Sequence, residues 1–294
     1  MRYVYPKFNP GYDLGIVRLG GPGLGNLLIF YAQAIVYAHE NDARIIYPTW
    51  PSIKLGPYIR REKDKRFYGD LFRHKDDEIS GLKKLFLLLF SRKNITMCDR
   101  YMLTMKEAGL LGKSAMIYSH LIKHNAHPEY MRNIRGSIAV HVRLGDFLRV
   151  SEAALKNNAE NSSTPVYWYA DTINKIRAIL GNNIQVYVFS DGTDEELKPL
   201  LELENCERIF CGNALNDILT IATASLLIGS GSTFSNWARY LGNMSAIYFP
   251  GQLREKFMNN NNENGFEIEL DNDEDFSADI IRKLRLKFDS FSHI

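Results

Sequence analysis

The sequence predicts an α/β fold built from two Rossmann-like domains. β-type runs alternate with helical patterns along almost the whole chain, which favours parallel sheets covered by helices. A strand–loop–helix pattern begins twice, once at 16–39 and again at 137. The length of 294 residues also suits two domains of ordinary size.

The elements can be placed by their hydrophobic pattern. Expected strands are GIVRL (15–19), ARIIYP (43–48), SIAVHVR (137–143), IQVYVFS (184–190), ERIFC (207–211), SLLIGS (225–230) and SAIYFP (245–250). Expected helices cover 26–39, a stretch around 100–122, 165–180, 193–203, 214–224 and 234–241. We place the domain boundary at 135/136, giving domains 1–135 and 136–294, and expect the C-terminal helix to be able to pack back on the first domain.

Composition excludes several classes of protein. A net charge of +2 does not support nucleic-acid binding through bulk electrostatics. Cys98, Cys206 and Cys211 are too few for a disulfide framework and fit a reducing compartment. The N-terminus lacks the apolar stretch of a signal peptide, and LFLLLF at 85–90 is too short to cross a bilayer. We therefore expect a cytoplasmic protein.

The glycine-rich segment GGPGLGN at 20–26 precedes an apolar helix. Its spacing matches neither a dinucleotide-binding loop nor a P-loop. In one interpretation Asn26 lies near the N-cap, and free backbone N–H groups beside Gly25 bind an anion. In the other, which the segment supports equally, the glycines only let the helix pack closely on its neighbours.

The segment SIAVHVRLGDF at 137–147 puts His141 and Arg143 on one face of a buried strand. Charged groups at the carboxyl end of a parallel strand are costly unless they meet a ligand or a carboxylate. A guanidinium suits two-pronged binding of a phosphate, so we favour a binding role for Arg143. The alternative is a structural Arg143–Asp146 pair with His141 satisfied in the core.

Two further strand ends carry polar groups. Ser190 and Asp191 follow one strand, where an ordinary capped turn is the slightly better interpretation. Ser232 and Thr233 follow another and could present hydroxyl and N–H groups to a pyrophosphate at a helix start. Asp217 is either an N-cap or a carboxylate that accepts from two N–H donors of guanine.

Metal chemistry is not expected. The histidines are scattered and no D-x-D motif is present, so arginine-assisted chemistry is favoured over cation-assisted chemistry. Two basic segments with apolar residues, 82–93 and 278–291, suit helices lying on an anionic membrane surface. Buried helices with solvated ends explain them about as well.

Taken together, GGPGLGNLLIFYAQA, HVRLGDF, VFSDG and GSGSTFSNWARYLG resemble fucosyltransferases in order and spacing. The resemblance covers about 16–250 and is closest to the bacterial α-1,2-fucosyltransferases of glycosyltransferase family 11. It implies a GT-B-type fold whose two Rossmann-like domains face a central cleft, with an acceptor-side first domain and a GDP-sugar-binding second domain. It also implies GDP-fucose as donor, transfer with inversion and no metal.

The resemblance assigns roles to individual residues. Arg143 would bind the β-phosphate and His141 would contact the nucleotide, while Asn26 would approach the pyrophosphate from the first domain. Ser232, Thr233 and Phe234 would hold the phosphates and the nucleoside. Asp217 matches an acidic residue that reads guanine in the more distant α-1,6 enzymes. Residue types alone name Asp146 and Asp13 as candidates for the base that accepts the acceptor proton.

The expected activity is transfer of L-fucose to a glycan hydroxyl, α-1,2 to galactose, in bacterial surface polysaccharide or O-antigen synthesis. A lipid-linked acceptor would bring the enzyme to the inner membrane surface. Leu144 stands where the bacterial enzymes usually carry a second arginine, and the alternatives stay open at this point. They are another linkage or acceptor, or a nucleotide-sugar-binding protein without catalysis.

Overall fold

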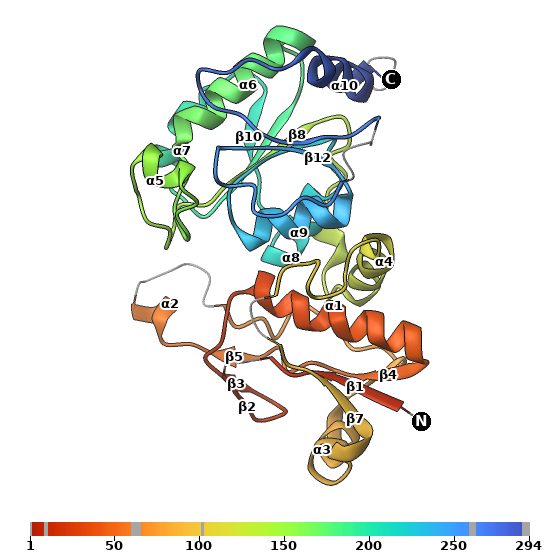
Figure 1. The fold of residues 1–294 in the computed structure, drawn as a ribbon. Coiled ribbons are helices and arrows are strands. Elements are labelled where there is room, and N and C mark those ends of the chain that lie inside the picture. The colour runs from red at the N-terminus through yellow and green to blue at the C-terminus, as the bar shows by residue number, and fades with distance from the viewer. Residues whose placement is uncertain (1, 9–10, 60–65, 101–102, 259–262, 290–294) are drawn as a thin grey trace. The chain divides into compact units, whose positions relative to one another are not determined.

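A computed structural model describes residues 2–8, 11–59, 66–100, 103–258 and 263–289 (Figure 1). The chain divides into two compact units, Met1–Glu129 and Tyr130–Ile294. Residues 130–135, which we expected in the first domain, lie with the second. The reason is local: the N–H groups of Arg132, Ile134 and Gly136 donate to the hydroxyls of Thr220, Thr223 and Ser225.

The second unit is built on a six-stranded sheet in which every neighbouring pair is parallel. Its strand order is β10-β9-β8-β11-β12-β13, so the chain starts in the middle, moves outward to one edge and then returns to build the other side. This is the order of a doubly wound dinucleotide-binding sheet. The strands are β8 (Ile138–Val142), β9 (Val186–Ser190), β10 (Cys206–Arg208), β11 (Leu226–Gly229), β12 (Ser245–Tyr248) and β13 (Glu267–Glu269).

Helices connect these strands, and their starts show why the sequence folds this way. Thr193 and Glu196 form a capping box at the start of α7, while Asn213 and Ser232 cap α8 and α9. The helices of the second unit are α5 (Glu152–Lys156), α6 (Val166–Leu180), α7 (Asp194–Leu201), α8 (Ala214–Ile221), α9 (Thr233–Gly242) and α10 (Ala278–Asp289).

The C-terminal helix α10 packs on α6, within its own unit (Figure 1). Ile280, Leu284 and Phe288 belong to the apolar core that the sheet shares with α6. The structure therefore makes α10 part of the core of its own unit, and packing of this helix on the first domain stays a prediction. Because these three side chains are buried, they are not available to contact a membrane, as the interpretation of 278–291 as a membrane-bound helix requires. Positions 290 and 291 lie outside the described residues.

The first unit contains a four-stranded parallel sheet of order β6-β4-β1-β7. Strand β1 (Arg2–Pro6), which lies between β4 and β7 in this sheet, was not predicted. The others are β4 (Ala43–Ile46), β6 (Glu78–Ile79) and β7 (Ile95–Cys98). Helix α1 (Leu24–Asn41) packs on β1 and β4, which are hydrogen-bonded neighbours.

The expected strand at 15–19 does not belong to that sheet. Only Arg18–Leu19 is extended, as β3, and it pairs with β2 (Tyr12–Asp13) and β5 (Ser52–Ile53) in a small separate sheet. The glycine loop therefore follows a segment, β2 and β3, that lies outside the four-stranded sheet. Gly20 and Gly21 have φ of 75° and 103°, values that favour glycine over residues with a Cβ.

The remaining helical segments are short. They are α2 (Gly56–Ile59), α3 (Gly81–Phe90), α4 (Ser114–His124) and the 3₁₀ turns Arg92–Asn94 and Pro128–Tyr130. Of the helix expected around 100–122, the structure has α4 alone; residues 101 and 102 lie outside the described part. Among the described residues, no helix is both long and apolar enough to cross a lipid bilayer.

The predicted α/β class with parallel sheets is confirmed in both units.

Candidate functional site

The candidate site lies at the carboxyl edge of the second sheet, where β8, β9 and β11 end. The chain leaves the central strand β8 for β9 on one side and later returns to β11 on the other. Loops after such strands diverge and leave a crevice between them, which is where doubly wound sheets bind ligands. His141 in β8 and the serine-rich segment after β11 meet at this point.

His141 is buried and held by three serines of that segment. Its Nδ1 lies 2.7 Å from Ser235 Oγ, 3.1 Å from Ser230 Oγ and 3.5 Å from Ser232 Oγ. Burial lowers the pKa of His141 to about 3, aided by the nearby Arg143 guanidinium and opposed by Asp191. The ring is therefore neutral, and it joins the end of β8 to the start of α9.

Phe234 covers the other side of this histidine. Its ring stacks on the His141 ring, with centroids 4.5 Å apart and planes inclined by 13°. Phe234 and the exposed Thr233 are the first residues of α9 after its cap, Ser232. Backbone N–H groups at the first helical positions have no acceptor inside the helix, so this helix start can receive an anion.

Arg143 lies directly after β8 and forms ion pairs with two carboxylates. One of its NH groups contacts Asp146, and the other lies 2.6 Å from Oδ2 of Asp191. The Arg143–Asp146 pair of the structural interpretation is thus present. These contacts use only part of the five N–H donors of a guanidinium, and the side chain is partly exposed. Arg143 is therefore held in place and still able to donate to an anion.

Asp191 joins the ends of β8 and β9. Its Oδ1 accepts a 2.8 Å hydrogen bond from the Leu144 N–H, while its Oδ2 pairs with Arg143. A Cβ on Gly145 would lie 2.3 Å from that Oδ2, so only glycine leaves room for the carboxylate there. The sequence predicted a capped turn after β9; the structure has that cap and also this bridge to Arg143.

Ser190 accepts hydrogen bonds within the turn after β9. Its hydroxyl accepts from the Gly192 N–H at 3.0 Å, and its carbonyl accepts from Arg208. The structure gives Ser190 contacts within the turn, and its predicted contact with the donor stays a prediction.

Asp217 is neither an N-cap nor fully buried. Asn213 caps α8, and Asp217 lies one turn further on, where Oδ1 accepts a 2.7 Å hydrogen bond from the Cys211 N–H. Burial raises the pKa of Asp217 to about 7, although the bonds from Cys211 lower it in part. A carboxyl with a strongly perturbed pKa beside a strand end is a candidate for a functional role.

Gly25 and Asn26, the predicted donor-binding residues of the first unit, lie in the first turn of α1. The N-cap of α1 is Gly23, and Asn26 is the third helical residue. The N–H groups of Leu24 and Asn26 already donate, to Tyr68 Oη and to the Gly23 carbonyl. Gly25 is buried behind them. At these positions the close-packing interpretation of the loop describes the structure better than free N–H groups do.

Asp13, one of the two candidate bases, is engaged in the first unit. Its carboxylate accepts from the Tyr5 hydroxyl and from the Gly15 N–H. Asp146, the other, pairs with Arg143.

The first unit also contains a cluster of metal-ligand type that was not predicted from sequence. Glu78, His120 and His124 each place one donor atom within 4.8 Å of the others. The histidines stand four residues apart on α4, a spacing that puts them on one helix face. That spacing was the available signal, but the glutamate that completes the cluster comes from β6 and could not be paired with it from sequence.

Comparison with known families decides the class. The family model described as "Glycosyl transferase family 11" matches residues 117–269. The chain belongs to glycosyl transferase family 11. The match contains β8, β9 and β11, and hence every residue of the candidate site in the second unit.

The solved structures that match this chain have low sequence identity to it. NodZ α-1,6-fucosyltransferase soaked with GDP-fucose has 16% identity and a TM-score of 0.44, over 84% of this chain and 94% of that one. NodZ from Bradyrhizobium has 16% identity and a TM-score of 0.43 over the same shares. POFUT1 in complex with GDP has 12% identity and a TM-score of 0.41, over 83% and 95%. No curated protein matches.

Proposed function

We propose that this family 11 enzyme transfers L-fucose from GDP-fucose, with inversion, to a glycan hydroxyl. The linkage proposed is α-1,2 to galactose, and the proposed setting is bacterial surface polysaccharide or O-antigen synthesis. Family membership supports glycosyl transfer. The choice of donor and linkage depends on the resemblance of the four sequence motifs to the bacterial α-1,2-fucosyltransferases.

The observation that supports this most is the grouping of Arg143, His141 and the start of α9 at the switch point of the sheet. A pyrophosphate needs fixed positive charge and N–H donors, and the ends of β8 and β11 offer both. Asp191 holds Arg143, and Ser230 and Ser235 hold His141. The donors are therefore positioned before the nucleotide binds.

The proposed reaction breaks one bond and forms one. The bond between the anomeric carbon and the β-phosphate oxygen breaks, and GDP leaves with the electron pair. The acceptor hydroxyl oxygen attacks the opposite face of the same carbon. Positive charge grows on the sugar and negative charge on the β-phosphate, where Arg143 and the α9 N–H groups stabilise it.

In the proposed transition state the bond to GDP is largely broken before the new bond forms. The acceptor hydroxyl therefore loses its proton late, to the Asp146 carboxylate or to water. Asp146 has the right chemistry, but its ion pair with Arg143 also gives it a positioning role. We further propose that no metal takes part in this step, because the guanidinium and the helix start already supply the positive charge.

We also propose that the enzyme works in the cytoplasm, at the inner face of the membrane. Helix α3 supports this, because its exposed face is apolar: Leu82 is 85% exposed, Leu89 72% and Phe90 74%. Its buried face instead carries Lys84, whose ammonium donates to Thr49 Oγ1. Soluble proteins rarely expose such a patch without a partner.

The charge around α3 favours an anionic lipid surface as that partner. Lys83 on the helix and Arg92 and Lys93 just after it are basic, and no acidic residue occurs between 81 and 98. Basic residues beside an apolar helix face attract anionic headgroups while the apolar side chains insert.

Calorimetric titration with GDP, UDP and NAD tests the donor class. Selective binding of GDP is expected, and selective binding of UDP or NAD would contradict the donor assignment.

Incubation with GDP-fucose and a panel of galactosides, followed by linkage-sensitive NMR, then tests the reaction. A product with another linkage would refute the α-1,2 assignment but keep the fucosyl donor, whereas GDP binding without any product would favour a non-catalytic protein.

A further inference from the structure

A buried polar cluster in the first unit joins three elements that are distant in sequence. His120 and His124 come from α4, Glu78 comes from β6 and Tyr31 comes from α1. The two imidazole rings are stacked, with centroids 4.1 Å apart and planes inclined by 13°. The proposed transfer reaction uses none of these residues.

The hydrogen bonds of the cluster fix the tautomer of His120. Tyr31 donates to Glu78 Oε1 at 2.8 Å, and its oxygen lies 3.0 Å from Nε2 of His120. Since the single phenolic proton goes to Glu78, Nε2 of His120 is the donor to Tyr31, and Nδ1 of that ring keeps a lone pair. Such a chain orients two ligands through one hydroxyl.

His124 and Glu78 have atoms without a satisfactory partner. His124 is fully buried, and its Nδ1 lies 3.3 Å from the Arg73 carbonyl and 3.1 Å from Glu78 Oε2. Its Nε2, 3.5 Å from Asp77 Oδ1, makes no hydrogen bond, and Oε2 of the buried Glu78 makes none either. Buried polar atoms normally find partners, and a buried carboxylate needs positive charge nearby.

We propose that Glu78, His120 and His124 bind a divalent transition-metal ion of the Zn²⁺ class and thereby fasten α4 to β6. A donor set of two imidazoles and one carboxylate suits zinc better than magnesium or calcium, which prefer oxygen ligands. An Nδ1–H directed at a backbone carbonyl, as in His124, is a usual arrangement for a histidine that binds zinc through Nε2.

The distances require only small side-chain movements. Zinc bonds to nitrogen and oxygen of about 2.0–2.2 Å separate tetrahedral ligand atoms by roughly 3.3 Å. The three donor atoms now lie within 4.8 Å of one another, so their longest separation must shorten by at most about 1.5 Å. Tyr31 then holds Glu78 and His120 in place from behind.

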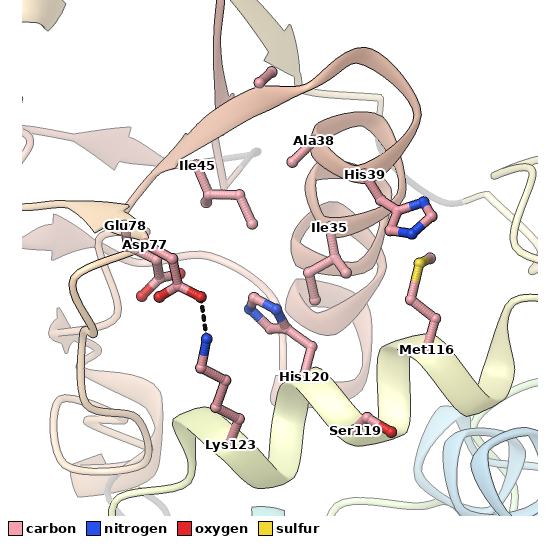
Figure 2. Close-up of a pocket in the computed structure, with 11 residues that line it drawn as sticks. Ile35, Ala38, His39, Ile45, Asp77, Glu78, Met116, Ser119, His120 and Lys123 are labelled. Atoms are coloured by element: carbon pink, nitrogen blue, oxygen red, sulfur yellow. Dashed lines mark hydrogen bonds and ion pairs between the residues drawn. The ribbon is translucent and has the colours of Figure 1, made fainter.

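A cavity of about 390 Å³ adjoins the cluster on the side of Glu78 and His120, and His124 is not among the residues that line it (Figure 2). His120, Asp77 and Glu78 line it, and Figure 2 shows the two carboxylates close to the His120 ring. Lys123 also lines the cavity, but its ammonium pairs with Asp77, which offsets its repulsion of a cation. His39 lines the same cavity without belonging to the ligand set.

Zinc titration of untagged, chelator-treated full-length protein tests this proposal, with metal content after dialysis and the melting temperature as readouts. We expect one zinc per chain and a higher melting temperature. His120→Ala and Glu78→Gln should weaken zinc binding by at least about 10-fold, and Tyr31→Phe by about 10-fold. His39→Ala is the matched control and should bind zinc as the wild type does. None of these readouts depends on transferase activity.

Several results would overturn the proposal. They are a wild-type protein that binds no stoichiometric zinc, a His120→Ala variant with unchanged affinity, or an equal loss in His39→Ala. Substituted Co²⁺ adds a spectroscopic criterion, since nitrogen and oxygen ligands give tetrahedral visible bands without thiolate charge transfer. A thiolate band would place the metal on Cys98, Cys206 or Cys211 instead, and would also refute this site.

Discussion

The two units each bury a glutamate, and they compensate its charge differently. In the second unit Glu267 lies 3.1 Å from the buried guanidinium of Arg239, and its Oε2 accepts from the N–H groups of Phe257 and Met258. In the first unit Glu78 has the Tyr31 hydroxyl and the neighbouring His124. A fixed cation neutralises Glu267, whereas Glu78 lies beside groups that suit a metal ion.

The units also differ in apolar surface. Of the large apolar side chains that are exposed in the described residues, thirteen belong to the first unit and five to the second. Those of α3 form a stripe at helical spacing, whereas exposed apolar residues of the second unit, such as Leu148, Phe210 and Leu286, are separated along the chain. In the described residues, the first unit therefore exposes more large apolar side chains than the second.

The largest effect is expected from the buried ion pair of the second unit. Glu267→Gln leaves Arg239 buried without an anion, and removal of one partner of such a pair costs about 3–5 kcal/mol. Urea denaturation measures the loss in free energy of unfolding. The exposed pair Arg254–Glu160 is the control, and Glu160→Gln should cost less than about 1 kcal/mol.

The same change in the first unit sharpens the comparison. Glu78→Gln in zinc-free protein should cost less than Glu267→Gln, because none of the described lysines or arginines forms an ion pair with Glu78, and Lys84 interacts with it more weakly than with Asp13. Equal losses would show that Glu78 is compensated as fully as Glu267, and the contrast between the units would fail.

Arg143→Ala tests the edge of the second sheet. Loss of one preorganised group that stabilises developing negative charge typically lowers the rate by about 10²–10³-fold. The initial rate of GDP release in the presence of acceptor measures this, with the far-ultraviolet circular dichroism spectrum unchanged. Arg149→Ala removes an exposed arginine of the same loop, paired with Glu196, and should keep activity. Near-normal turnover of Arg143→Ala would remove this residue from the mechanism.

The apolar face of α3 predicts membrane binding by the first unit alone. Burial of a phenylalanine contributes about 1.5–3 kcal/mol, so Phe90→Ser should weaken binding to phosphatidylglycerol vesicles by about 10- to 100-fold. Flotation at low salt measures the bound fraction. Leu286→Ser on α10 changes an exposed leucine of the second unit and should have no effect. Equal loss in both variants, or no vesicle binding by the wild type, would contradict the proposal.

The smallest expected effect concerns the pH dependence of GDP binding. Asp217, with a pKa of about 7, must be ionised to accept from two guanine N–H donors. Its ionised fraction falls from about 90% at pH 8 to about 10% at pH 6, so GDP affinity should fall about 10-fold. Calorimetry of wild type and Asp217→Asn separates this from titration of the phosphates, which both share. The same pH dependence in both would exclude Asp217.

Protein stability gives an independent check on this carboxyl. Because the folded pKa lies above the ordinary 3.8, the fold favours protonated Asp217. The associated stability is lost as the pH rises through 7, so the wild type should become less stable relative to Asp217→Asn between pH 6 and pH 8.

The regular half of the chain was predictable from sequence because its signals are local. The strands β8, β9, β11 and β12 are mostly buried runs of β-branched or apolar residues, and capping residues such as Thr193 and Ser232 mark helix starts. His141 and Arg143 could be placed at a strand end for the same reason. Their partners could not, since Asp191 and Ser235 are 48 and 94 residues away from them in sequence.

In the first unit the same local signals misled. The strand before the glycine loop was expected in the main sheet, but β1 occupies that place. The excursion through β2 and β3 separates β1 from α1 in sequence, so adjacency along the chain did not give adjacency in the sheet. Asn26 was expected near the N-cap; it is the third helical residue, and Gly23 is the N-cap.

The sequence by itself determined the α/β class, the parallel strands of the second unit and the strand ends that carry His141, Arg143, Asp191 and Ser232. Hydrophobic periodicity and capping act within a few residues, so they can be recognised without a structure. Only the tertiary structure decided that Asp191 and Asp146 hold Arg143 together, that α10 closes the second unit, and that Glu78 meets His120 and His124. These contacts depend on which strands become neighbours, and sheet order is set by packing across the whole unit.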